Sequence, residues 1–376
     1  MPFLVVGAIA LLIVLFFFGR FCSAATTIDV TINGAPLTIH GAKTMQVAIK
    51  ESGLPINPGD LISLSGTVLK KSDGYPFAAT VNGTETSDPD YQLHSGDVIV
   101  VKDGKDRLEE YDAYQEPKAH NGSVVGLGAI CVFEAGQDGV LETRTGRISG
   151  DVVQQVTTQP IGTECTRYNP NVGDDKVLAL TFDEGPSGEF TGQILDILKQ
   201  NEAKATFFCT GEKIEGNADL VKRERSEGHQ VCSSTYSLLR TGIYTGTFSG
   251  SVEPDRLAEE VQRGQQALAD ALGGEQPSKI VRMPLAELTG ELAAAVDTMV
   301  EFDIGWNLDT GDWMQGDANE IYDVLMQAES GDVIALHDGY GDRSNTISAL
   351  KKALPLLKNR GFSFITIDEL MKYPSY

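Results

Sequence analysis

The sequence carries little positive charge for its length. Its 376 residues include 30 lysines and arginines against 53 aspartates and glutamates, which gives a formal net charge of −23. Nucleic acids and anionic lipids are themselves negative, so this balance argues against either as a bulk partner, and we expect no nucleic acid to bind. A neutral glycan is compatible with it, as is the plainer interpretation that the acidity only keeps a surface protein soluble.

Cysteine is scarce, and the spacings typical of zinc or redox motifs are missing. The five cysteines form no CxxC pair, which argues against a zinc knuckle and a thioredoxin-type motif. In an exported chain, the natural disulfide pairs are Cys131 with Cys165 and Cys209 with Cys232. Free buried thiols are an equal alternative, and the spacing leaves both open.

Charge is absent altogether from the first 19 residues. They include an unbroken apolar run at 11–18, and the whole stretch is close to the ~20 apolar residues that span a bilayer. We expect residues 1–25 to direct the chain to the membrane, as a retained anchor or as a signal cleaved among the small residues 22–25. The rest of the chain is then extracellular, anchored to the cell membrane or secreted.

The sequence before residue 176 is rich in short strands and turns. Residues 26–105 show alternating strands, Asn-Gly turns at 33–34 and 82–83, and a helical stretch at 44–51. With the closing strand pattern at 91–101, this segment resembles a small ubiquitin-like β-grasp domain. Residues 106–175 are rich in glycine and threonine and predict a β-rich connector. Neither segment shows a catalytic motif, so we expect binding or spacing roles.

Residues 176–376 alternate strand and helix, which indicates an α/β fold class. Amphipathic helices are predicted at 192–200, 256–272 and 344–360, and such alternation implies a parallel sheet with right-handed crossovers. We predict a closed or nearly closed seven-stranded (β/α) barrel, whose chemistry lies at the carboxyl ends of the strands. The seven apolar strands begin near Val177, Ala205, Gln230, Ile280, Phe302, Asp332 and Ser363.

Several short motifs stand at these predicted strand ends in a fixed order. They are LTFDEGP at 180–186, KATFFCTG at 204–211, VRMP at 281–284, DTGDW at 309–313 and LHD at 336–338. This ordered set resembles the polysaccharide deacetylases of carbohydrate esterase family 4, the NodB-homology domain, over residues 176–376. The resemblance implies the barrel of that family and hydrolysis of a non-peptide C–N bond, the N-deacetylation of a carbohydrate.

The resemblance also assigns catalytic roles to four residues. It implies that Asp183 is the general base and His337 the general acid, because one group must take a proton from water and another must give one to the leaving amine. Arg282 matches the arginine that orients the base, and Asp312 matches the carboxylate that tunes this network. The alternative is an inherited salt-bridge scaffold, since ion networks also occur for structural reasons.

Three further residues match the substrate pocket of the family. Trp313 resembles a wall of the acetyl pocket, and Pro284 and Leu285 follow the arginine in sequence. The backbone N–H of Leu285 is a candidate donor to an oxyanion, because backbone donors do not depend on the side chain. The pocket departs from the family pattern at 285–286, where Leu-Ala replaces Tyr-Gly, and at Ala335, which replaces a leucine.

The metal-binding motif of the family is degenerate. The family uses a divalent metal such as zinc, held by the second carboxylate of the first motif and by two histidines four residues apart. Glu184 matches the carboxylate, but Ser234 and Leu238 stand at the histidine positions, and no histidine lies between His229 and His337. A serine hydroxyl is a poor ligand for zinc, and leucine has no donor. We therefore expect no metal cofactor.

These departures favour a protein that binds acetylated cell-envelope carbohydrate, such as peptidoglycan or another N-acetylated polysaccharide, with weak or no catalysis. One alternative is an active deacetylase with an altered metal site, for which Cys209, Cys232 and Glu184 offer donors, or with no metal site. Another is a structural surface protein whose β-rich segments bind partners.

Overall fold

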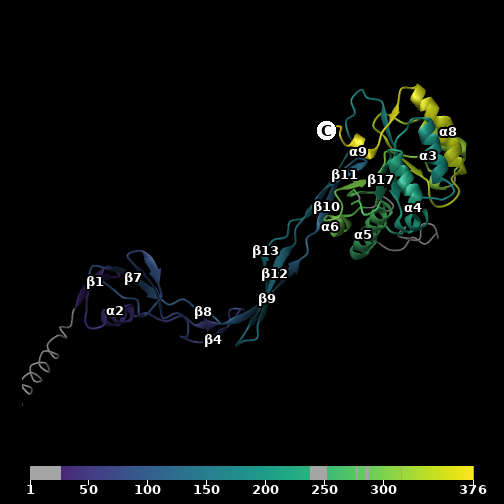
Figure 1. Cartoon of the computed structure of the whole chain (residues 1–376). Helices are drawn as coiled ribbons and strands as arrows, with labels where there is room; N and C mark the ends of the chain where they lie inside the picture. Colours follow the sequence, from purple (N-terminus) through teal and green to yellow (C-terminus); the bar gives the residue numbers. More distant parts are fainter. Residues whose placement is uncertain (1–26, 238–251, 277, 284–287, 315, 376) are drawn as a thin grey trace, which may run out of the picture. The chain divides into compact units, whose positions relative to one another are not determined.

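The computed structural model describes residues 27–237, 252–276, 278–283, 288–314 and 316–375 (Figure 1). The chain divides into two compact units. The first unit comprises the chain up to Glu116 together with Leu141–Thr157, and the second comprises Pro117–Val140 and Thr158–Tyr376. The predicted membrane segment, residues 1–25, lies outside the described residues. Among the helices that are described, none is long and apolar enough to cross a membrane.

The first unit contains a five-stranded sheet and one helix that packs on it. Strand β1 alternates buried and exposed residues, so Ile28, Val30 and Ile32 face the helix and enter the core. The helix ends at Gly53, whose φ of 66° is a left-handed conformation that glycine adopts readily. The sheet order is β2-β1-β7-β5-β6, from β1 Ile28–Ile32, β2 Ala35–Ile39, β5 Phe77–Val81, β6 Thr84–Thr86 and β7 Val98–Asp103, and the helix is α2, Met45–Ser52.

Two small sheets follow. One has the order β4-β3-β8 and the other the order β13-β12-β9. A buried carboxylate, that of Glu109, joins them, because it accepts hydrogen bonds from the backbone N–H groups of Leu64 (3.1 Å), Ile148 (2.8 Å) and Ser149 (2.9 Å). Their strands are β3 Leu61–Ile62, β4 Val68–Lys70, β8 Arg107–Leu108, β9 Tyr111–Lys118, β12 Gly139–Gly146 and β13 Val152–Thr158.

The second unit is an α/β domain built on a curled sheet of eleven strands. Its order is β10-β14-β11-β19-β18-β17-β16-β15-β21-β20, and β22 also pairs with β15. Strand β15 is parallel to three neighbours and is buried from Val177 to Phe182. The strands are β10 Gly122–Gly126, β11 Ile130–Glu134, β14 Thr163–Tyr168, β15 Val177–Asp183, β16 Ala205–Cys209, β17 Gln230–Ser233, β18 Ile280–Val281, β19 Phe302–Ile304, β20 Leu308–Asp309, β21 Val333–His337 and β22 Ser363–Phe364.

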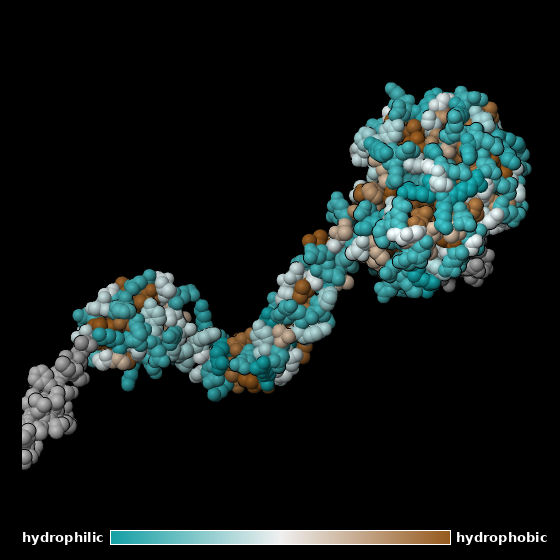
Figure 2. Space-filling view, viewed as in Figure 1, coloured by the Kyte–Doolittle hydropathy of each residue, from teal (hydrophilic) through white to brown (hydrophobic). Residues whose placement is uncertain are grey.

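Helices cover this sheet and bury a large apolar core between themselves and the strands. Helix α8 packs on both α3 and α7, and α5 packs on both α4 and α6. The surface seen in Figure 2 is predominantly hydrophilic over this unit. The helices are α3 Thr191–Gln200, α4 Gly211–Ser226, α5 Pro254–Ala271, α6 Gly290–Val296, α7 Ala318–Leu325, α8 Ser344–Asn359 and α9 Ile367–Leu370, with a 3-10 turn, η2, at Asp312–Met314.

The α/β prediction is confirmed, since all seven expected strands form within a residue of their expected starts. The sheet differs from a closed barrel in two respects. Strand β20 adds an edge, and no pairing in the described residues joins it to the opposite edge. In addition, β10, β11 and β14 come from the segment that we expected to be a connector. Strand β11 pairs antiparallel with β19 and covers an edge that would otherwise expose unpaired backbone groups.

A buried polar cluster attaches these added strands to the α/β unit. The carboxylate of Asp297, just after α6, accepts hydrogen bonds from Thr163 Oγ1 (2.5 Å) and from the backbone N–H of Gly136 (2.7 Å). The His120 ring lies between Asp297 Oδ2 (3.1 Å) and Asp138 Oδ1 (2.7 Å). The expected boundary at residue 175 therefore divides strands that the structure places together.

The four described cysteines, Cys131, Cys165, Cys209 and Cys232, are free and buried. In the parallel pairing of β16 with β17, Cys232 lies beside Phe208, one residue before Cys209. Successive residues of a strand point to opposite faces, so the side chains of Cys209 and Cys232 lie on opposite sides of the sheet. The disulfide that we expected between Cys209 and Cys232 is therefore wrong, and the alternative of free buried thiols holds for this pair.

We predict that these four thiols react only after unfolding, because all four side chains are buried and reactivity needs an accessible thiolate. In a full-length Cys22→Ser protein kept free of reductant, a disulfide-exchange reagent should detect almost no thiol in the native state. It should detect all four thiols in guanidinium. A prereduced sample is the control, and two missing thiols in the untreated denatured sample would reveal a disulfide and contradict the structure.

Candidate functional site

Two tightly packed turns form the centre of the site at the carboxyl ends of β15 and β21. In these neighbouring parallel strands, Asp183 lies beside His337 in the register. After Asp183 the chain turns through Glu184, which has a φ of 69°. Gly185 and Gly339 let the turns approach, because an added Cβ would lie 2.1 Å from Asp338 Oδ2 and 1.9 Å from the Glu184 carbonyl oxygen, respectively.

Arg282 holds Asp183 in place. Its Nη1 donates to both carboxylate oxygens of Asp183, at 2.8 and 2.9 Å, and to Thr181 Oγ1 at 2.8 Å. Its Nε and Nη2 donate to the carbonyl oxygens of Ile304 and Gly305, each at 2.7 Å. The guanidinium is only 4% exposed, so its charge is neutralised and its donors are satisfied inside the protein.

Asp312 holds His337 in the same way. Its Oδ1 lies 2.7 Å from His337 Nδ1, and its Oδ2 accepts from the His337 backbone N–H at 3.0 Å. Thr346 Oγ1 donates to the same Oδ2 at 2.9 Å. Because Nδ1 is engaged by Asp312, Nε2 is the ring nitrogen that remains for a ligand.

The environment of His337 favours the charged imidazolium. Burial lowers the pKa of His337, but the hydrogen bond and charge of Asp312, together with the charges of Asp183 and Glu184, outweigh burial and raise this pKa to about 9. Burial raises the pKa of Asp312, but the hydrogen bond and charge of His337, the charge of Arg343 and the hydrogen bond from Thr346 together outweigh burial, so the Asp312 pKa is lowered. Near neutral pH the pair is ionic.

The structure thus brings the four residues assigned to catalysis, Asp183, Arg282, Asp312 and His337, to one end of the sheet. Their assigned roles in proton transfer stay predictions. Of the three pocket residues, Trp313 lies in η2, half-buried, and its Nε1 donates to Asp309 Oδ2 at 3.4 Å. Pro284 and Leu285 lie outside the described residues.

The residues at the family's metal position do not fit a divalent ion. Ser234 is buried, its Oγ donates to the Arg282 carbonyl oxygen at 3.1 Å, and its backbone N–H donates to the Cys209 carbonyl oxygen at 2.9 Å. Leu238 lies outside the described residues and has no donor atom. In the part of the chain that the structure describes, no three His, Cys, Asp or Glu side chains form a group able to hold a metal.

Four polar residues that support the site were not identified from the sequence. Thr181 and Thr346 hold Arg282 and Asp312, as described above. Arg343 is 2% exposed and donates to the carbonyl oxygens of Asp312 (2.7 Å) and Gly339 (2.9 Å). Asp338 is 1% exposed and accepts from Thr191 Oγ1 at 2.5 Å. Asp338 follows His337 directly in the LHD motif, and this position was the one sign in the sequence that Asp338 lies at the site.

A second buried carboxyl group lies behind the first turn. Glu224 of α4 is fully buried, and Cys209 Sγ donates to its Oε2 at 3.6 Å. Burial, reinforced by the charge of Asp338, raises the pKa of Glu224 well above its ordinary value. Burial likewise raises the pKa of Asp338 to about 7, even though the Thr191 hydrogen bond lowers it. Burial therefore favours the protonated form of Glu224.

The fold and the ordered motifs of this unit are similar to those of carbohydrate deacetylases. Residues 171–300 match the family model for polysaccharide deacetylase. The chain is 32% identical over 205 residues to a peptidoglycan-N-acetylglucosamine deacetylase of Bacillus cereus, a match that covers 53% of this chain and 90% of the relative. It is 30% identical over 208 residues to a chitooligosaccharide deacetylase of Rhizobium leguminosarum bv. trifolii, covering 52% of this chain and 92% of that relative.

Among solved structures, a peptidoglycan N-acetylglucosamine deacetylase is 31% identical, with a TM-score of 0.48, and the match covers 55% of this chain and 92% of that one. The sequence relatives show the family. The chain belongs to the polysaccharide deacetylases, the NodB-homology family, as the sequence motifs predicted.

We predict that Asp312 sets the charge of His337. In Asp312→Asn the carboxylate is lost while burial remains, so the pKa of His337 should fall from about 9 toward or below 6.5. NMR titration of the histidine ring measures it directly. The matched control is Asp309→Asn, an exposed aspartate of the same motif, which should leave that pKa unchanged. An unchanged pKa in Asp312→Asn would show that the pair is not coupled.

Proposed function

We propose that this protein is an extracytoplasmic member of the polysaccharide deacetylases that binds N-acetylated cell-envelope glycan, with weak or no deacetylation. One observation carries the proposal. The two ion pairs, Arg282 with Asp183 and His337 with Asp312, are intact, whereas Ser234 stands buried at a metal-ligand position. The residues that would contact the amide of the glycan are present, whereas the histidines that would hold a water-activating metal ion are replaced.

The acetamido group is the chemical group that this pair of residues fits. It offers one N–H donor and one C=O acceptor, and the site offers one carboxylate and one imidazolium. The Asp183 carboxylate accepts from the amide N–H, and Nε2 of His337 donates to the carbonyl oxygen. Both side chains are partly accessible, at 13% for Asp183 and 11% for His337, so a ligand reaches them from the mouth of the sheet.

Hydrolysis needs more than this recognition. A divalent ion lowers the pKa of bound water from 15.7 to about 7 and polarises the carbonyl. Both oxygens of Asp183 already accept hydrogen bonds from Arg282, so this carboxylate alone is a poor substitute for the ion. The intact pairs leave a slow, metal-independent deacetylation as the second candidate function, because His337 can still donate a proton to a leaving amine.

The location of the protein is part of the proposal and is supported by the sequence. The uncharged residues 1–19 direct the chain to the membrane as an anchor or a cleaved signal. The glycan of the cell envelope is then within reach of the second unit. The curated relatives described above are named for peptidoglycan and chitooligosaccharides, which are both N-acetylated carbohydrates.

We predict that glycan binding depends on the protonation of His337. Because its pKa is raised to about 9, the donor at Nε2 is present through neutral pH and is lost as the pH rises through 9. The affinity of the full-length protein for chitotetraose, measured by calorimetry, should stay constant from about pH 6 to pH 8 and fall above 9. His94→Asn, at an exposed histidine of the first unit, should keep this profile. A midpoint near 6.5 would contradict the assignment.

We predict that restoring the ligands restores metal binding. In Glu184→Asp combined with Ser234→His and Leu238→His, zinc should bind stoichiometrically, because two imidazoles and a carboxylate complete a three-ligand site. Turnover of chitotetraose should rise from a very low level but stay modest, since the pocket has drifted at Leu285 and Ala335. Metal content and acetate release are the readouts. Wild-type protein that holds one zinc, or turns over as fast as this variant, would overturn the proposal.

A further inference from the structure

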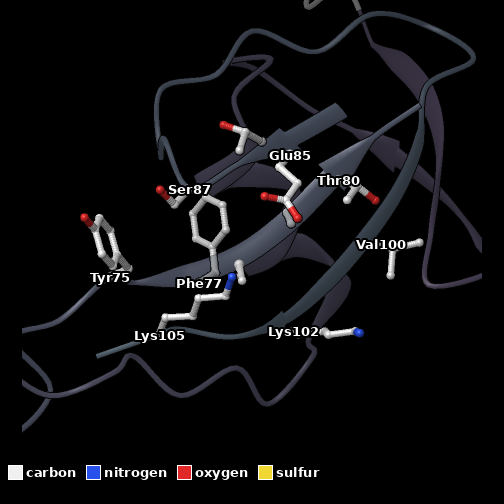
Figure 3. Close-up of a pocket in the computed structure, with 11 residues that line it drawn as sticks. Tyr75, Phe77, Thr80, Glu85, Ser87, Val100, Lys102 and Lys105 are labelled. Atoms are coloured by element: carbon white, nitrogen blue, oxygen red, sulfur yellow. The ribbon is translucent and has the colours of Figure 1, made fainter. Parts of the chain in front are cut away.

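A groove in the sheet of the first unit has no role in the site described above. It has a volume of about 610 Å³ and is lined by residues of β5, β6, β7 and the chain segments beside them. Figure 3 shows Tyr75 at one side, Val100 at the other, and Glu85 and Lys105 over the middle. In β7, Ile99 and Val101 are buried in the core beside the helix. Val100 and Lys102 alternate with them along the strand, so these two side chains face away from the core.

The aromatic corner of this groove is held rigidly. The backbone N–H of Tyr75 donates to the Lys105 carbonyl oxygen at 2.9 Å, and the Tyr75 carbonyl oxygen accepts from Gly59 at 3.0 Å. At Gly104 an added Cβ would lie 1.8 Å from that carbonyl oxygen, so only glycine allows the approach. The backbone of Tyr75 is thus fixed while its side chain is 44% exposed, and Val100 beside the groove is also 44% exposed. The tyrosine ring and the valine each offer an apolar surface to a ligand, at opposite sides of the groove.

The groove is lined by two lysines, Lys102 and Lys105, and one glutamate, Glu85, so its own charge is slightly positive, in contrast to the chain as a whole. Lys102 and Lys105 are exposed, and in the described residues neither forms an ion pair. The neighbouring carboxylates of Asp103 and Asp106 keep their negative charge and accept hydrogen bonds from the backbone N–H groups of Asn57 (2.8 Å) and Asp60 (2.7 Å), respectively. Two unpaired ammonium groups in a chain of net charge −23 favour an anionic group on the ligand.

We propose that this groove is a second carbohydrate site, which takes an N-acetylated glycan that carries carboxylates, as peptidoglycan does through its muramyl and peptide groups. One sugar rests on Tyr75 and another, at the opposite side of the groove, on Val100. Hydroxyls meet Thr80 and Glu85, and carboxylates meet Lys102 and Lys105. The volume lies in the ordinary range for small-molecule sites, about 300–1,000 Å³. The choice of glycan as ligand class rests on the proposed function, whereas the charge preference rests on the groove alone.

Charge reversal tests this site. The double variant Lys102→Glu with Lys105→Glu should bind a soluble N-acetylglucosaminyl-N-acetylmuramyl peptide at least about tenfold more weakly, and this loss should shrink in high salt. Its affinity for neutral chitotetraose should change little. The matched control is Lys50→Glu, an exposed lysine in α2, outside the groove. Tyr75→Ser should weaken both ligands, whereas Tyr114→Ser, at an exposed tyrosine of β9, should weaken neither. Calorimetry on the full-length protein gives all affinities.

Comparison of the charge-reversal variant with His337→Ala distinguishes the groove from the site in the α/β unit. If charge reversal leaves the muramyl peptide affinity unchanged, the groove proposal is overturned, and a loss in His337→Ala still supports the proposed function. If charge reversal abolishes binding while His337→Ala has no effect, the groove stands and the proposed function fails. An equal loss for a carboxylate-rich peptide without sugar would identify an acidic peptide site and overturn the glycan assignment.

Discussion

The guanidinium of Arg282 is the buried charge around which the α/β unit is organised. A cation that is removed from water must have its donors satisfied and its charge balanced, and here acceptors from β15 and from the segment around β19 meet both needs. The guanidinium also lies 4.4 Å from the centre of the Phe208 ring and 5.5 Å from that of Trp306. One side chain thereby fixes the relative positions of several strand ends, and Asp183 is one of its balancing charges.

In this arrangement the buried charges of the site are balanced by groups of the chain itself. Arg282 is neutralised by Asp183, and His337 by Asp312, so neither pair depends on an added ion to balance its charge. Ser234 uses its hydroxyl on the Arg282 carbonyl oxygen and so joins the same network. Removing one member of a buried pair costs about 3–5 kcal/mol, because the other charge remains unpaired. Both pairs therefore contribute to stability, whatever chemistry remains.

The sequence alone predicted those parts of this unit in which the apolar pattern of a strand and the motif at its end indicate the same element. Apolar strands such as β15 and β21 are continuous, and each ends in a motif whose residues meet at one edge of the sheet. The pairing of β11 with β19 was not predicted, because it joins residues about 170 positions apart through short strands that alternate only weakly. Glu224 was also missed, since a charged residue in an exposed-looking helical pattern gives no sign that α4 buries it beside Cys209. Burial, together with the charge of Asp338, raises the pKa of Glu224 and so favours its neutral form.

The added strands β10, β11 and β14 change what counts as the smallest foldable piece of this protein. A fragment starting at residue 176, where the strand-helix alternation begins, would expose the edge of β19 and the side of α6 that these strands cover. It would also leave the Asp297 carboxylate without His120, Thr163 and Gly136. An open strand edge beside an orphaned buried acid promotes aggregation. Expression of the α/β unit by itself therefore calls for a start near Pro117, with the segment Leu141–Thr157, which belongs to the first unit, either retained or replaced by a linker.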